Sequence, residues 1–161
     1  MAVDKHSFYH ELGRQLAALI EGERDLIANT ANMSALIYHG LPDLNWAGFY
    51  FARRQELVLG PFQGKPACVR IRWREGVCGA AAARGSSIVV PDVDEFPGHI
   101  ACDPGSRSEL VVPLLDQGRV LGVLDLDSPV RRRFDDEDRA GCERLVGILL
   151  AHQLRWPEAF A

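Results

Sequence analysis

Two apolar runs at residues 110–114 and 119–127 constrain the fold most, because a short polar segment at 116–118 joins them. This segment contains aspartate and glycine, which accept the backbone conformations of tight turns. The two runs therefore predict a β-hairpin. Successive side chains of a strand point to opposite faces, so the second run divides into two sets. These sets are Val120, Gly122, Leu124 and Leu126 on one face, and Leu121, Val123, Asp125 and Asp127 on the other.

Four further segments have strand patterns. Residues 45–51 are rich in aromatic side chains, and 56–61 returns after a polar turn as the second strand of a hairpin. Residues 69–73 alternate between apolar and polar, and 87–91 contain a β-branched run. Together with the 110–127 hairpin, these segments predict a sheet of about six strands.

Helical patterns stand at both ends of the chain. We expect a first helix capped by Ser7, a second at 25–38 that stops at a glycine, and a closing helix at 135–153. The expected apolar stripe of the first helix is Leu12, Leu16, Leu19 and Ile20. A short alanine-rich helix is expected at 75–85, between the strands at 69–73 and 87–91. A long loop is expected at 92–107. Helices around a meander of strands predict an antiparallel α+β domain.

Length and charge narrow the class of protein. A chain of 161 residues suits one domain. A net charge of −4 disfavours nucleic acid and anionic membranes as partners. No apolar run approaches the roughly 18 residues of a membrane span, and the first residues lack the apolar centre of a signal peptide. We therefore expect a cytoplasmic protein, a compartment in which thiols stay reduced.

The four cysteines are Cys68, Cys78, Cys102 and Cys142, and no two form a CxxC pair. In the cytoplasm they are expected to be free, catalytic or redox-active. Free cysteines are usually buried, yet Cys102 lies beside an Asp-Pro-Gly turn. Cys78 stands at the start of the short helix, where unpaired backbone amides favour a thiolate. Cys142 lies among apolar residues of the closing helix, so we expect it in the core.

Acidic residues accompany these thiols. Asp125 and Asp127 share a strand face, either because the strand ends in solvent or because they form a negatively charged wall for a substrate ammonium group. Glu109 could protonate a departing oxygen. These groups suggest thiol redox chemistry on a small cationic molecule. A cysteine–histidine hydrolase is disfavoured because His99 lacks an orienting set. No zinc site is expected, because His99 and the cysteines match no standard ligand spacing.

Six segments resemble the free methionine-(R)-sulfoxide reductases, which are single-domain GAF proteins. The segments are 45–50, 59–64, 76–81, 96–103, 106–113 and 122–129, so the resemblance covers nearly the whole chain. Ordinary GAF domains lack three cysteines at these spacings. The resemblance implies one GAF domain over residues 1–161. It also implies terminal helices on one face of the sheet, with the short helix and loops enclosing a pocket on the other.

The resemblance also implies roles for the cysteines. Cys102 matches the nucleophile that becomes a sulfenic acid, and Cys68 matches the cysteine that resolves it as a disulfide. Cys78 matches a third family cysteine with an auxiliary role. His99 is expected to be a hydrogen-bonding residue of the loop.

The remaining site residues follow from the same resemblance. Glu109, Asp125 and Asp127 match the carboxylates that hold the substrate's ammonium group and help polarise or protonate its sulfoxide. Trp46 matches the aromatic wall that receives the methyl group, and Tyr50 lies on the same strand face by alternation.

The implied activity is reduction of free L-methionine-(R)-sulfoxide to L-methionine. The resemblance implies no bound cofactor, thioredoxin or a similar dithiol as external reductant, and the R epimer as substrate. A homodimer is compatible with it, since the end helices of GAF domains often pair. The alternatives are a GAF sensor that binds a small ligand without transforming it and a general peroxide-reducing thiol protein.

Overall fold

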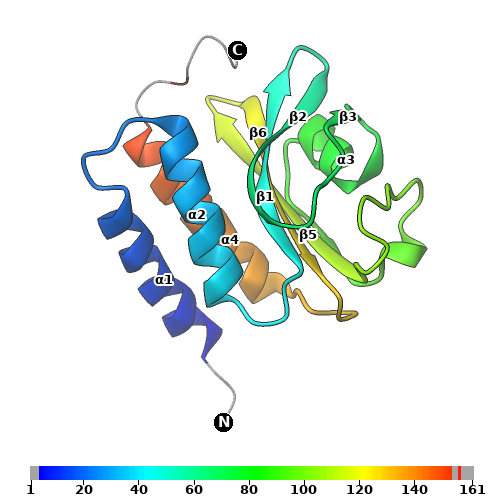
Figure 1. Cartoon of the computed structure of the whole chain (residues 1–161), viewed down its shortest axis with the longest axis horizontal. Coiled ribbons are helices and arrows are strands. Elements are labelled where there is room, and N and C mark those ends of the chain that lie inside the picture. Colours follow the sequence, from blue (N-terminus) through cyan, green and yellow to red (C-terminus); the bar gives the residue numbers. More distant parts are fainter. Residues whose placement is uncertain (1–3, 154–155, 157–161) are drawn as a thin grey trace.

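A single antiparallel sheet forms the centre of the protein. Figure 1 shows the computed structural model, which describes residues 4–153 and residue 156. The predicted domain boundaries at 1 and 161 lie outside these residues. The strands are β1 (Trp46–Arg53), β2 (Glu56–Gly64), β3 (Arg70–Arg72), β4 (Ile88–Val90), β5 (Ser108–Asp116) and β6 (Arg119–Ser128). Their order is β3-β2-β1-β6-β5-β4, which confirms a six-stranded antiparallel sheet.

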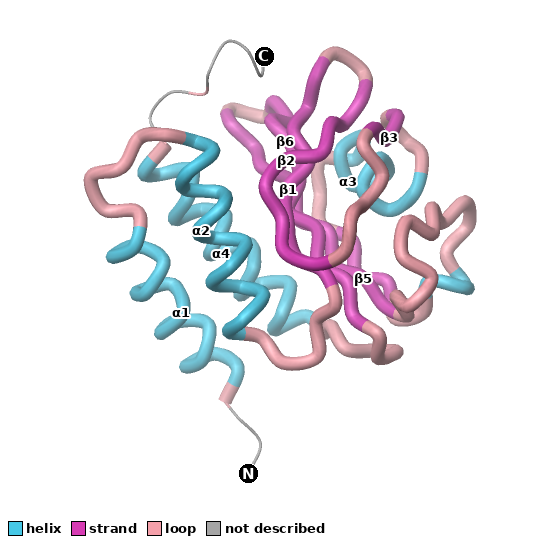
Figure 2. The backbone as a smooth tube through the Cα atoms, in the orientation of Figure 1, coloured by secondary structure: helices cyan, strands magenta, loops and turns pink. Residues whose placement is uncertain are grey.

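The helices lie on both faces of this sheet. The terminal helices α1 (Lys5–Leu19), α2 (Leu26–Gly40) and α4 (Asp136–His152) share one side, as Figures 1 and 2 show. The short helix α3 (Gly76–Arg84) and the 3-10 turn η1 (Val93–Glu95) lie on the other side with the long loops. This arrangement confirms the predicted α+β layers. None of the helices in the described part of the chain has the length and apolar character that crossing a bilayer requires.

Two apolar clusters fill the two sides of the sheet. Strand β1 supplies Phe49 and Phe51 to the cluster under the helices, and Trp46 and Tyr50 to the cluster under α3. All four side chains are at least 97% buried. Burying an aromatic side chain contributes about 1.5–3 kcal/mol, so this alternation stabilises both layers. The same alternation places Trp46 and Tyr50 on the face of β1 that is turned toward α3.

The N-terminal prediction was wrong in two details. Asp4, not Ser7, caps α1, because its carboxylate accepts a hydrogen bond from the backbone N–H of His6. Ser7 lies inside the first turn and donates its hydroxyl to Asp4. Leu19 was expected in the buried stripe, yet it is 46% exposed, whereas Leu16 and Ile20 are buried. Leu19 is the last residue of α1 and is not part of the apolar cluster that contains Leu12, Leu16 and Ile20.

The predicted alternation of β6 is also wrong at one end. Leu121 packs in the helix-side cluster and Val120 packs against the other, the reverse of the expectation. The cause is a β-bulge, because the register passes from Leu114 opposite Gly122 to Leu115 opposite Val120 and leaves Leu121 as an extra residue. From Val123 to Asp127 the alternation is as predicted, so both aspartates lie on the α3 side.

Candidate active site

The residues predicted to form the site converge on one pocket under α3. Seven of the eight line it: Trp46, Tyr50, Cys78, Cys102, Glu109, Asp125 and Asp127. The eighth, Cys68, lies beside the pocket and is joined to Cys102. Strands β1, β5 and β6 supply the floor, while the loop at 92–107 supplies one wall. Residues from five separate segments of the sequence therefore meet in one place.

A disulfide between Cys68 and Cys102 closes one side of this pocket, with the two Cα atoms 5.6 Å apart. Cys68 lies two residues before the edge strand β3, and Cys102 lies in the loop between β4 and β5. These segments adjoin opposite edges of the sheet, so the disulfide joins them across its α3 face. Both cysteines are half-buried, which leaves this pair accessible from solvent.

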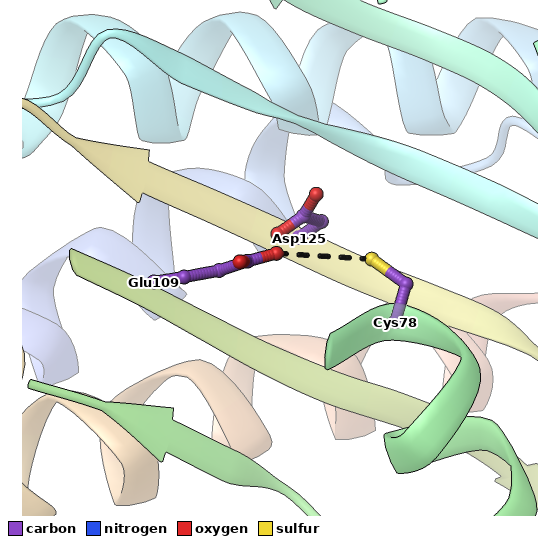
Figure 3. Close-up of side chains that lie close together, drawn as sticks. All are labelled: Cys78, Glu109 and Asp125. Carbon is purple, nitrogen blue, oxygen red and sulfur yellow. Dashed lines mark hydrogen bonds between the residues drawn. The ribbon is translucent and has the colours of Figure 1, made fainter. Parts of the chain in front are cut away.

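Three carboxylates stand at the base of the pocket on adjacent strands. Glu109 of β5 lies directly opposite Asp127 of β6. Asp125 lies on the same face of β6, two residues before Asp127. Glu109 and Asp125 are 5% and 6% exposed. Cys78 Sγ donates a weak hydrogen bond to Glu109 Oε1 at 3.9 Å, as Figure 3 shows, and His99 Nε2 lies 3.3 Å from Glu109 Oε2. His99 is thus a hydrogen-bonding loop residue, as predicted, with Glu109 as its partner.

Burial changes the ionisation of these groups. Desolvation and the nearby Asp127 carboxylate raise the pKa of Glu109 to about 8. Burial and neighbouring carboxylates raise the pKa of Asp125 and of Asp127 well above the ordinary aspartate value. Burial lowers the pKa of His99, which favours a neutral imidazole. The predicted acidic wall is therefore at least partly protonated while no cation lies against it.

Cys78 behaves differently from the prediction. It is the third residue of α3 and is buried, and burial raises its pKa well above that of an ordinary thiol. The carboxylates of Asp125 and Glu109 add to this increase. Their charge and the lost hydration outweigh the backbone amides at the start of the helix, so Cys78 is held as a thiol.

Two aromatic residues of β1, Trp46 and Tyr50, line the pocket together with the carboxylates. The rings of Trp46 and Tyr50 stack with their centroids 5.9 Å apart, and Phe62 also stacks with Trp46, at a centroid distance of 5.2 Å. The indole N–H of Trp46 donates to the carbonyl of Lys65 at 3.1 Å. The Tyr50 hydroxyl donates to the carbonyl of Cys68 at 2.9 Å. Both aromatic residues thereby hold the segment that carries Cys68.

Sequence reasoning missed the contact that anchors the loop of Cys102. Asn45 Nδ2 donates to Asp103 Oδ2 and to Ser106 Oγ, each at 3.2 Å. Asp103 also accepts from the backbone N–H of Gly105 at 2.8 Å, which closes the turn beside Cys102. The Asp-Pro-Gly motif indicated the turn itself. Nothing local in the sequence indicated that Asn45, just before β1, would hold it.

The sequence matches the GAF domain family over residues 9–154. It is 52% identical over 147 residues to the free methionine-R-sulfoxide reductase of Escherichia coli K12, covering 91% of this chain and 89% of that relative. The chain belongs to the free methionine-R-sulfoxide reductases. This reductase is also 58% identical to protein YtsP of Bacillus subtilis 168, over 84% of each chain.

A solved structure supports the same assignment. The free methionine-R-sulfoxide reductase of Neisseria meningitidis, determined in complex with its substrate, superposes on this reductase with a TM-score of 0.91. The two sequences are 44% identical, and the match covers 96% of this chain and 93% of the other.

The fourth cysteine of this reductase, Cys142, lies outside the pocket, on the helix side of the sheet. Cys142 is fully buried in the helix-side cluster, with its Sγ 4.0 Å from the Tyr9 hydroxyl. The sheet separates it from the pocket, which agrees with the predicted packing role.

Proposed function

We propose that this protein reduces free L-methionine-(R)-sulfoxide to L-methionine with two of its own thiols, Cys102 and Cys68. The observation that carries this proposal is the disulfide between them at the wall of a pocket with three carboxylates and an indole. The relative from N. meningitidis binds its substrate in the same fold. A purely ligand-binding GAF module would have no need of two cysteines that can pair across its pocket.

In the first step, the Cys102 thiolate attacks the sulfoxide sulfur. Glu109 supplies a proton to the sulfoxide oxygen, a role that suits a carboxyl whose pKa is about 8. The attack forms a bond between the Cys102 sulfur and the substrate sulfur. This bond and the substrate's sulfur–oxygen bond then break as the oxygen, with the proton from Glu109, passes to Cys102 and makes it a sulfenic acid. Methionine departs with its sulfur reduced by two electrons.

In the second step, the Cys68 thiol attacks the sulfenic acid of Cys102. The new sulfur–sulfur bond forms as the hydroxyl leaves with a proton as water. An external dithiol such as thioredoxin then reopens the disulfide by thiol–disulfide exchange and is itself oxidised. The half-buried position of both cysteines gives such a reductant access to them.

The substrate's ammonium group lies against Asp125 and Asp127 in this proposal. Asp125 Oδ1 is buried and has no hydrogen-bond partner among the described residues, so it is available to a donor from the substrate. A cation at this position favours the ionised carboxylates and lowers their pKa. Glu109 keeps its proton for the sulfoxide, while the aspartates release theirs. The methyl group packs against Trp46.

The enclosure of the pocket explains a preference for the free amino acid. Methionine sulfoxide inside a peptide has no free ammonium group to pair with the carboxylates. Its flanking chain would also have to pass the loop that Asn45 anchors over the pocket. We therefore expect peptide-bound methionine sulfoxide to be a poor substrate.

The decisive experiment measures turnover of four substrates with thioredoxin recycling: R and S methionine sulfoxide, each free and within a peptide. The free R epimer should be reduced fastest. Cys102→Ser should lower this rate by about a thousand-fold or more. Cys142→Ser, a change of the thiol on the far side of the sheet, is the matched control and should retain turnover. Normal turnover by Cys102→Ser would overturn the proposal.

Two further outcomes address the alternatives. Binding of the free sulfoxide with no loss of titratable thiols would indicate a sensor. Faster thiol loss with peroxide than with methionine sulfoxide would indicate a peroxide-reducing protein. The reductase predicts the loss of two thiols per molecule of free sulfoxide consumed.

A further inference from the structure

A second kind of ligand fits the base of the pocket. Cys78, Glu109 and Asp125 each place one ligand atom within 4.8 Å of the others, and all three residues are buried (Figure 3). They come from α3, β5 and β6, so three separate elements hold them in place. Cys78 is a free thiol, because the disulfide joins Cys68 and Cys102.

The chemistry of these three groups is that of a zinc ligand set. Zn²⁺ binds one sulfur and two carboxylate oxygens readily, at about 2.3 Å and 2.0–2.2 Å. Ligand atoms around a tetrahedral zinc ion are then about 3.5 Å apart. Cys78 Sγ and Glu109 Oε1 are already 3.9 Å apart, so small side-chain rotations bring them to this distance.

A second observation at this place concerns one oxygen of Asp125. This side chain is 94% buried, yet its Oδ1 atom has no hydrogen-bond partner among the described residues. A buried carboxylate oxygen without a partner is costly, and a cation would satisfy it. His99 adds a further nitrogen at the rim, 3.3 Å from the other oxygen of Glu109. A fourth ligand position can therefore be filled by His99 or by water.

The geometry points to a binding site for Zn²⁺ and similar borderline-soft divalent ions at Cys78, Glu109 and Asp125. An ion bound there occupies the place proposed for the substrate's ammonium and sulfoxide groups, so zinc and substrate exclude each other. On binding, the Cys78 proton passes to solvent and the thiolate coordinates the metal. The sequence spacing of His99 and the cysteines predicted no such site, because two of its three ligands are carboxylates from separate strands.

The disulfide form of the protein allows a test that is independent of catalysis. In this form Cys68 and Cys102 are bonded, and the free thiols are Cys78 and Cys142. Titration with Co²⁺, a spectroscopic substitute for Zn²⁺, reports thiolate coordination by a sulfur-to-cobalt charge-transfer band. No substrate or reductant is present, so a negative result would leave the proposed reductase activity unaffected.

We expect one equivalent of Co²⁺ to bind the disulfide form with a charge-transfer band, and Zn²⁺ to displace it. Cys78→Ser should abolish the band, whereas Cys142→Ser should keep it. Asp125→Asn should weaken binding at least tenfold and provides a second test should Cys78→Ser fold poorly, as judged by circular dichroism. Absence of stoichiometric binding, a band that persists in Cys78→Ser, or a band lost in Cys142→Ser would overturn the inference.

Discussion

Glu109 and Asp127 lie directly opposite each other on β5 and β6, so their side chains point to the same face of the sheet. This pairing depends on the bulge at Leu121. The turn pairs Asp116 with Arg119, and an unbroken ladder from this pair would place Leu126, not Asp127, opposite Glu109 on the pocket face. Glu109 faces the pocket by the regular alternation of β5, and the one extra residue of β6 shifts the register so that Asp127 lies opposite it. A local irregularity near the turn therefore brings the two aspartates to the face of Glu109.

The raised pKa of Glu109 predicts a pH-dependent stability. The folded carboxyl has a pKa of about 8, above the value of about 4.3 in an unfolded chain. Below about pH 4 this carboxyl is protonated in both states, so it does not reduce the free energy of unfolding. As the pH rises toward 8, the carboxyl ionises readily only in the unfolded chain, and the free energy of unfolding falls. We expect Glu109→Gln to gain a few kcal/mol of stability relative to wild type between pH 5 and 8.

Urea unfolding at several pH values, with a chelator present, measures this difference. Glu21→Gln, a change of an exposed glutamate, is the control and should follow wild type. Parallel stability curves for wild type and Glu109→Gln would contradict the raised pKa.

Substrate binding should release protons. The ammonium group favours ionised Asp125 and Asp127, whose pKa values are raised by burial in the free pocket. The Cys102→Ser variant binds without turnover, so calorimetry in buffers of different ionisation enthalpy can count the protons. We expect release of about one proton per substrate at neutral pH. A binding enthalpy that is the same in every buffer would refute this coupling.

Removing the resolving cysteine should stop the cycle after one step. Cys68→Ser can form the sulfenic acid on Cys102 but cannot close the disulfide. We expect a burst of about one methionine per protein and thioredoxin-dependent turnover reduced by about a hundred-fold or more. Mass spectrometry after dimedone treatment should find the adduct on Cys102. Wild-type steady-state turnover by Cys68→Ser would rule out its resolving role.

The packing of α1 against α4 provides a stability test with a matched control. A Cβ atom added at Gly141 would lie 2.2 Å from the ring of Tyr9, whose hydroxyl donates to Asp138. Gly141→Ala should therefore destabilise the protein by about 1–3 kcal/mol. Gly147 is in the same helix with nothing within 4 Å of an added Cβ, so Gly147→Ala should stabilise by about 0.5–1 kcal/mol. Thermal unfolding measures both, and equal effects would contradict the packing.

Local patterns in the sequence predicted much of this site. Alternation along one strand placed Trp46 and Tyr50 on a common face, and the same rule placed Asp125 beside Asp127. The proximity of Cys68 and Cys102 came from resemblance, because the two cysteines lie 34 residues apart and no local pattern measures such a distance. These contacts depend on how distant segments fold together.

Other features could not be predicted because they depend on tertiary packing. No residue type near Leu121 marks the β-bulge in the sequence. Simple alternation therefore assigned the Leu121 side chain to the wrong face. The state of Cys78 was misjudged for a similar reason. Its helix position favours a thiolate, but burial, and after it the carboxylates of β5 and β6, raise its pKa.

The bond between Cys68 and Cys102 also sets the order of events in the proposed cycle. While it is intact, Cys102 has no thiolate, and a second molecule of sulfoxide finds no nucleophile. The oxidising substrate and the reducing protein must therefore take turns at one sulfur atom, which is ping-pong kinetics. Above a certain sulfoxide concentration the reductant alone governs how fast methionine is recovered.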